Sequence, residues 1–113
     1  MTNSFDKETH DLFFSNGWQE CWWCGANHAD CGHHIFGRGY GDGPESSPLN
    51  YAPLNNQKCH IAIHGRISTD AGRKRLLEKT ISYLVSLGYK LDDRDNAFLE
   101  KYKDHIARLK LNI

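Results

Sequence analysis

Four glycines alternate with other residues from Gly37 to Gly43, and Pro44 follows directly. Glycine and proline are the strongest local breakers of regular structure, so an element before this stretch must end near Phe36. A phosphate-cradling loop would need a Gly-Lys-Ser/Thr sequence after the glycines and a long apolar strand before them, and the chain has neither. The stretch therefore predicts a loop between two short strands, one over residues 29–36 and one over about 50–54.

Helices are expected on both sides of these strands. In chain order, the expected elements are a helix over 5–16 ending at Asn16-Gly17, a tight turn at Cys21–Gly25, a helix over about 56–64 ending at Gly65, a helix from Thr69 or Asp70 to Gly88, and a last helix from Asp92 or Asp93. The last two keep their apolar residues at helical spacing and should turn them to the core: Leu76, Leu77, Ile81, Leu84, Val85, Phe98, Leu99, Tyr102, Ile106 and Leu109. The pattern predicts an α+β fold.

The chain of 113 residues is expected to form one domain, 1–113, near the size at which a small core gains from extra cross-links. It contains no apolar run long enough to span a membrane. Residues 1–20 are polar and carry no signal-peptide pattern, so we expect a reducing, cytoplasmic location and no membrane partner. In that compartment the four cysteines are expected to be metal ligands or thiols rather than disulfides.

The formal net charge is zero, which argues against a protein that coats nucleic acid non-specifically. The charges are nevertheless uneven along the chain. Residues 1–35 carry one base and five acids, whereas residues 36–79 carry seven bases and four acids. Residues 80–113 carry six bases and five acids. The basic excess in the middle fits a local phosphate contact, and a solvated basic face explains it equally well.

Two histidines four residues apart, His60 and His64, would lie on one face of the expected helix, where both imidazoles can hold one metal ion. The zinc-peptidase motif H-E-x-x-H has a similar pair, with its glutamate serving as the general base. Here Ile61 stands at the glutamate position, which excludes the peptidase. A base must come from elsewhere, and the His33-His34 pair upstream is the candidate.

The segment 29–64 thus has a strand, a loop, a second strand and a helix, with His33-His34, Asn50 and His60 with His64 in that order. This arrangement resembles the HNH, or ββα-metal (His-Me finger), endonuclease family. The H-x-x-x-H helix is similar to that of the nuclease colicins, and the upstream Cys-x-x-Cys-Gly is similar to phage-encoded members. The resemblance covers about residues 21–66 and implies a small ββα-metal core. The N-terminal helix and a helical extension over about 70–110 flank that core.

The resemblance implies a role for each of these residues in hydrolysis of DNA phosphodiester bonds, by nicking or by double-strand cutting. His34 would be the general base, since a histidine can take a proton from water near neutral pH. His33, His60 and His64 would hold one divalent cation, and Asn50 would join strand and loop by side-chain hydrogen bonds and keep His34 aimed. The implied products carry a 5′ phosphate and a 3′ hydroxyl. Imidazole ligands favour Zn²⁺, Ni²⁺ or Mn²⁺ over Mg²⁺, although the sequence does not select the working ion.

The geometry of a β-strand sets a condition on the roles implied for His33 and His34. Neighbouring residues of a regular strand point to opposite faces, so His33 and His34 reach one phosphate only if the strand ends, bulges or twists there. Gly32 and the glycines after Phe36 allow such a departure. In a regular strand, one of the two would be an ordinary surface histidine.

The cysteines imply a second, structural zinc site. Cys21-x-x-Cys24 has zinc-knuckle spacing, and HNH proteins often add a second Cys-x-x-Cys before the helix histidine. Here Asn56 occupies the first position of that second pair, while Cys59 occupies the other. We therefore expect the zinc ligands to be Cys21, Cys24, Cys59 and Cys31, with His28 as the alternative to Cys31. Buried thiols at Cys31 and Cys59 are the competing interpretation.

Five basic residues near the motif are expected to contact DNA phosphates without reading sequence: Arg38, Arg66, Arg73, Lys74 and Arg75. Trp22 and Trp23 are expected to pack around the zinc knuckle rather than stack on bases. DNA is the expected partner, together with phage or host DNA-processing proteins. Two alternatives stay open: a non-catalytic, zinc-stabilised DNA- or protein-binding module, and a structure-specific nuclease that acts on branched DNA.

Overall fold

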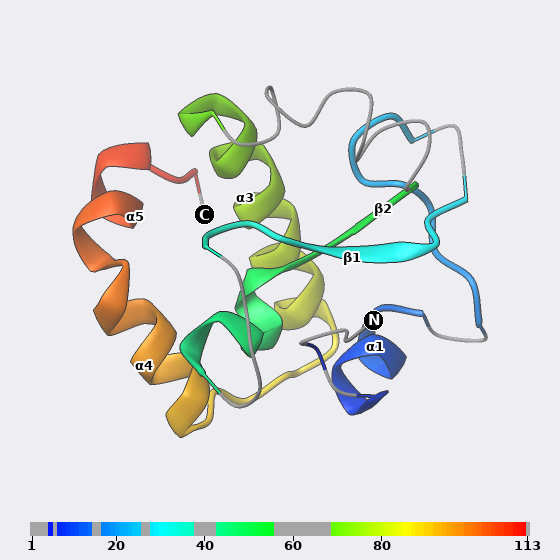
Figure 1. Ribbon diagram of the computed structural model, residues 1–113, viewed down its shortest axis with the longest axis horizontal. Coiled ribbons are helices and arrows are strands. Elements are labelled where there is room, and N and C mark those ends of the chain that lie inside the picture. The colour runs from blue at the N-terminus through cyan, green and yellow to red at the C-terminus, as the bar shows by residue number, and fades with distance from the viewer. Residues whose placement is uncertain are drawn as a thin grey trace.

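The computed structural model describes residue 5 and residues 7–14, 17–25, 28–37, 43–55 and 69–112. Within these ranges, four α-helices and a two-stranded antiparallel sheet form a compact α+β fold (Figure 1). The elements are α1 (Lys7–Phe13), β1 (Cys31–His34), the 3₁₀ turns η2 (Pro44–Ser46) and η3 (Pro48–Asn50), β2 (Tyr51–Leu54), α3 (Asp70–Ser86), α4 (Asp93–Lys101) and α5 (Lys103–Leu109). None of the helices in the described part of the chain has the length and apolar character needed to cross a membrane.

The two predicted strands form and pair with each other, which confirms the strand–loop–strand unit. Their register places Cys31 opposite Leu54, Gly32 opposite Pro53, His33 opposite Ala52 and His34 opposite Tyr51. Both strands are shorter than predicted, although backbone hydrogen bonds continue past both ends of β1. Asp30 N–H donates to Leu54 O at 3.0 Å, and Ile35 N–H donates to Asn50 O at 3.1 Å.

The side chain of Tyr51 is fully buried and lies directly over Gly32 of the neighbouring strand. A Cβ atom added to Gly32 would lie 2.5 Å from Tyr51 Cε2 and 2.6 Å from Cζ. The Tyr51 ring also stacks on Phe13 of α1, with ring centroids 4.4 Å apart and planes inclined by 13°. Gly32 is thus needed for the close approach of this ring, which joins the sheet to α1.

Replacing Gly32 with alanine is expected to lower the free energy of unfolding by about 1–3 kcal/mol, the usual cost of overpacking a core. Gly17→Ala serves as a comparison without a clash, because its Cβ would meet no atom within 4 Å and it shows only the strain of alanine at a φ of 74°. Urea titration should give Gly32→Ala a free energy of unfolding clearly below that of the wild type. A Gly32→Ala variant as stable as the wild type would contradict the packing of Tyr51 on Gly32.

The helix starts predicted in the C-terminal half are confirmed. Thr69 caps α3 by accepting a hydrogen bond from Gly72 N–H at 3.1 Å, and Asp92 caps α4 through a reciprocal capping box with Asp95. Helix α3 packs on both β2 and α5 (Figure 1). Its buried apolar residues are Leu76, Leu77 and Leu84, so the predicted core stripe is present.

Three details of the helix prediction are wrong. Val85 is 72% exposed and does not belong to the core. Helix α1 begins at Lys7 and ends at Phe13, inside the predicted range of 5–16. The single helix predicted from Asp92 is divided at Tyr102, whose backbone (φ −108°, ψ 15°) is not helical. Its ring is held by long-range contacts to Phe36 and Glu45, which spacing along the helix does not encode.

Several predicted features lie outside the described residues. They are the helix over about 56–64 with Cys59, His60 and His64, the loop residue Arg38, and Arg66. The positions that the structure describes are His28, His33, His34, Asn50, Cys21, Cys24, Cys31, Arg73, Lys74 and Arg75.

Candidate functional site

The histidine pair lies at the end of β1. His33 is opposite Ala52 and is only 7% exposed, while His34 is opposite Tyr51 and is half-buried. Pairing is regular through both residues, so their side chains leave opposite faces of the strand. β1 ends at His34 and contains no bulge, so the joint reach of the two histidines to one phosphate stays a prediction. Neither histidine is an ordinary surface residue.

Asn50, the last residue of η3, joins the end of β1 to the loop before β2. Its side chain is completely buried. Its Oδ1 accepts from Phe36 N–H at 2.7 Å, and its Nδ2 donates to Phe36 O at 3.0 Å and to Glu45 O at 2.8 Å. All of these partners are backbone groups, so the amide fixes the path of the chain two residues after His34. The side-chain hydrogen bonds predicted for Asn50 are therefore present.

Helix α4 and the residue after it hold the loop that carries Asn50. The carboxylate of Glu45 in η2 is buried and pairs with Lys101 Nζ, and Tyr102 Oη donates to Glu45 Oε2 at 2.6 Å. Burial alone would raise the pKa of Glu45, but these hydrogen bonds outweigh it and hold the pKa below its ordinary value. Glu45 thus stays charged at neutral pH and ties η2 to the C-terminal helices.

A second carboxylate, that of Asp95, ties η3 to α4. Asp95 is completely buried and accepts hydrogen bonds from Ser47 Oγ and from Tyr89 Oη, each at 2.6 Å. Ser47 also accepts from Leu49 N–H at 3.1 Å and so caps the turn that ends at Asn50. The helical extension that the resemblance left unmatched therefore supports the loop next to the histidine pair.

Phe5 stacks on the imidazole of His34. The ring centroids are 4.3 Å apart and the planes are inclined by 16°, so the two rings are nearly parallel. Phe5 is 3% exposed and also meets the Tyr51 ring edge-on at 4.6 Å. A residue from the start of the chain therefore contacts the predicted general base directly.

Two of the predicted zinc ligands, Cys21 and Cys31, lie near each other. Trp22 N–H donates to Pro53 O at 3.0 Å, which places the Cys21–Gly25 turn against β2. Cys31 faces Leu54 in the same sheet, and its thiol lies 3.3 Å from Leu54 O. The pKa of Cys31 is raised to about 11, chiefly by burial, with further contributions from the nearby Asp30 and Cys21. Cys24 is exposed.

These donors suit Zn²⁺ chemically, since thiolates are its usual ligands in structural sites. Among the residues that the structure describes, however, no three His, Cys, Asp or Glu side chains are arranged to hold a metal ion. Both predicted metal sites draw ligands from Cys59, His60 and His64, which lie outside those residues. The ligand sets, including the choice of Cys31 over the exposed His28, stay predictions.

Of the five basic residues predicted to contact DNA, the structure describes Arg73, Lys74 and Arg75, and these differ in their contacts. Arg73 Nε donates to Ile35 O at 3.1 Å, and its guanidinium lies 5.6 Å from the centre of the Phe36 ring. Arg75 stacks over Trp23 at 4.4 Å and donates to Trp23 O. Both arginines therefore support the protein's own structure, Arg73 at the strand end that follows His34. Trp22 is buried, as predicted for a packing residue.

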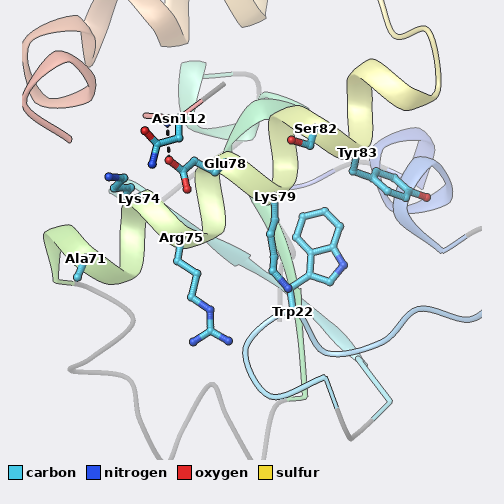
Figure 2. A pocket seen from close by; sticks show the side chains of 9 residues that line it. All are labelled: Trp22, Ala71, Lys74, Arg75, Glu78, Lys79, Ser82, Tyr83 and Asn112. Carbon is cyan, nitrogen blue, oxygen red and sulfur yellow. Dashed lines mark hydrogen bonds between the residues drawn. The ribbon is translucent and has the colours of Figure 1, made fainter. Parts of the chain in front are cut away.

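Lys74 and Arg75 line an open groove of about 650 Å³ along α3, together with Lys79 and Trp22 (Figure 2). Glu78 also lines it, and its Oε2 accepts a hydrogen bond from Asn112 N–H at 2.6 Å. The groove has a basic excess, which suits an anionic ligand.

Sequence reasoning missed the residues that support the histidine pair: Phe5, Tyr51, Glu45, Ser47 and Asp95. Asp95 has a local signal, since it completes the capping box that starts at Asp92. Phe5 and Tyr51 read only as apolar residues of short elements. Their partners lie far away in the chain, so spacing alone could not reveal them.

No family model, curated protein or solved structure matches this chain. The resemblance to HNH endonucleases therefore rests on the sequence motifs.

Proposed function

We propose that the protein is a metal-dependent HNH endonuclease that hydrolyses DNA phosphodiester bonds. The observation that supports this best is the buried Asn50 amide, which closes a pair of hydrogen bonds with Phe36 directly beyond His33-His34. An HNH site needs an asparagine in this part of the chain to fix the strand that carries its base. A binding module has no need for a histidine pair held in this way.

In this mechanism His34 takes the proton from the attacking water, and Asn50 keeps the end of β1 in place while it does so. His33, with His60 and His64, would hold one divalent cation. When bound, that cation would neutralise charge on the phosphoryl group and on the departing 3′ oxygen. His33 is buried and His34 is half-buried.

We further propose a structural zinc held by Cys21, Cys24, Cys31 and Cys59. Metal analysis of the purified protein should find one tightly bound zinc that is lost in Cys24→Ser. The same zinc should persist in His60→Ala, because His60 belongs to the other site. Loss of Cys24 should also lower stability strongly, since structural zinc contributes to folding directly. Equal zinc content in the wild type and Cys24→Ser would contradict this ligand set.

DNA is the proposed substrate and partner. Lys74 and Arg75 beside the groove on α3 are suited to phosphate contacts, and such contacts position DNA without reading its sequence. Arg73 and Arg75 are weaker candidates than Lys74, because their guanidinium groups are already bonded to Ile35 O and Trp23 O. Arg38 and Arg66 complete the proposed set, and we propose that the protein acts in the cytoplasm.

The function is tested by incubating supercoiled plasmid with the protein and Mn²⁺, Mg²⁺, Ni²⁺ or Zn²⁺. We expect metal-dependent nicks that DNA ligase reseals without prior treatment, because the products carry a 5′ phosphate and a 3′ hydroxyl. His34→Ala prepared in parallel controls for a contaminating nuclease. Absence of cleavage with every ion, on both plasmid and branched DNA, would overturn the proposal and favour the binding module.

A further inference from the structure

The position of His34 in β1 does not determine the orientation of its imidazole. Rotation about the bond between Cβ and the ring of a histidine has a broad preference, so neighbouring groups must set the ring plane. A general base also has to be held close to its productive geometry, within about 0.5 Å and 10–20°. Asn50 fixes only backbone groups beyond the strand. Some other contact must therefore orient the ring itself.

The Phe5 ring meets that need. It lies parallel to the imidazole at 4.3 Å, and a stacked ring restricts rotation of the imidazole out of its plane. Its contact with Tyr51 is edge-on, with planes inclined by 62°. Since Tyr51 is the ladder partner of His34, Phe5 bridges two paired residues on the same face of the sheet.

Tyr51 is itself held firmly. Its ring lies on Gly32 and stacks on Phe13, and its Oη is hydrogen-bonded to His10 Nδ1 at 2.6 Å. Both Phe13 and His10 belong to α1. The contacts therefore form a continuous chain from α1 through Tyr51 and Phe5 to His34.

We infer that Phe5, Tyr51, Phe13 and His10 form an aromatic clamp that orients the His34 imidazole, with Phe5 as the positioning residue. This inference rests on the proposed function for its catalytic consequence. It gives the N-terminal segment, which lies outside the motif, a part in the hydrolytic site. The contact between Phe5 and His34 can be tested separately from catalysis.

The catalytic consequence is tested with Phe5→Leu, which keeps an apolar side chain and removes the aromatic face. We expect kcat for plasmid cleavage to fall about tenfold, with KM unchanged, because only orientation of the base is lost. Phe5→Tyr should retain most of kcat. Phe14→Leu is the matched control, since Phe14 lies near His10 and Tyr51 at centroid distances of 6.2 and 6.5 Å. A loss of kcat in Phe14→Leu as large as that in Phe5→Leu would overturn the inference.

The contact is tested by NMR of the histidine ring protons, with the His34 signals assigned by their loss in His34→Ala. A stacked phenyl ring shifts protons above its face upfield. That shift should disappear in Phe5→Leu and persist in Phe14→Leu. Unchanged His34 signals in a folded Phe5→Leu would overturn the inference even if the protein cleaves DNA. Wild-type protein that shows the upfield shift and cuts no DNA would instead refute the proposed function and leave the contact established.

Discussion

The His34→Ala variant is expected to cleave DNA about 10²- to 10⁴-fold more slowly than the wild type, the usual cost of removing a general base. In the proposed mechanism the His34 imidazole takes the proton from the attacking water, so its removal leaves that step without a base. We expect the variant to fold, because His34 is half-buried and ends its strand. The checks are initial rates of plasmid nicking at matched metal concentrations and thermal unfolding of both proteins.

His105→Ala is the matched control for this prediction. His105 lies on α5, bonds to Asp70 at 3.0 Å and packs on Phe36, but has no proposed role in catalysis. It should lose some stability and retain cleavage within a small factor. If His34→Ala cuts DNA as fast as His105→Ala, the assignment of the base is wrong.

The Asn50→Ala variant is expected to lose about 3–5 kcal/mol of unfolding free energy. The change removes three hydrogen bonds and leaves Phe36 N–H, Phe36 O and Glu45 O unpaired in the interior. An unsatisfied buried group costs about 1–3 kcal/mol. A loss of this size is a large part of the 5–15 kcal/mol that stabilises a typical domain, so a chemical unfolding curve will show it clearly.

Asn96→Ala is the control for Asn50→Ala. Asn96 is exposed on α4, where alanine is a good helix former, so its stability should stay within about 0.5 kcal/mol of the wild type. Asn50→Asp adds a second comparison: it keeps the size of the side chain but cannot donate to Phe36 O and Glu45 O when ionised. It should therefore fall below the wild type in both stability and cleavage. A tolerated Asn50→Ala would show that the amide does not secure the loop.

The local signals in the sequence predict much of the fold. The glycines from Gly37 onward predict the end of β1, and the two strands pair as expected. The caps at Thr69 and Asp92 are confirmed because capping depends on side chains within three residues. Elements whose ends depend on neighbours in sequence are thus the ones that sequence predicts well.

What sequence reasoning missed depends on contacts between distant residues. Tyr102 divides the last helix because Glu45 and Phe36 hold its ring. Arg75, which the sequence predicts to contact DNA, also stacks on Trp23, a residue more than fifty positions away that the sequence does not indicate as its partner. Spacing along one helix carries no information about such partners.

The sequence likewise predicts only part of the candidate site. The motif predicts which residues carry the chemistry, and it predicts the hydrogen-bonding task of Asn50. It does not predict what keeps Asn50 in place, because the buried carboxylates of Glu45 and Asp95 act from a turn and a helix. Nor does it predict the Phe5 ring on His34. The catalytic roles themselves stay predictions.

Chemical rescue tests most directly whether His34 is the base of a hydrolytic site. Removing the imidazole in His34→Ala leaves space beside the Phe5 ring, where added imidazole can stack as the side chain does. We expect imidazole to raise the nicking rate of His34→Ala in proportion to the concentration of neutral imidazole, and to leave the rate of the wild type unchanged. An active wild type whose His34→Ala variant is inactive at every imidazole concentration would contradict the role of His34 as general base.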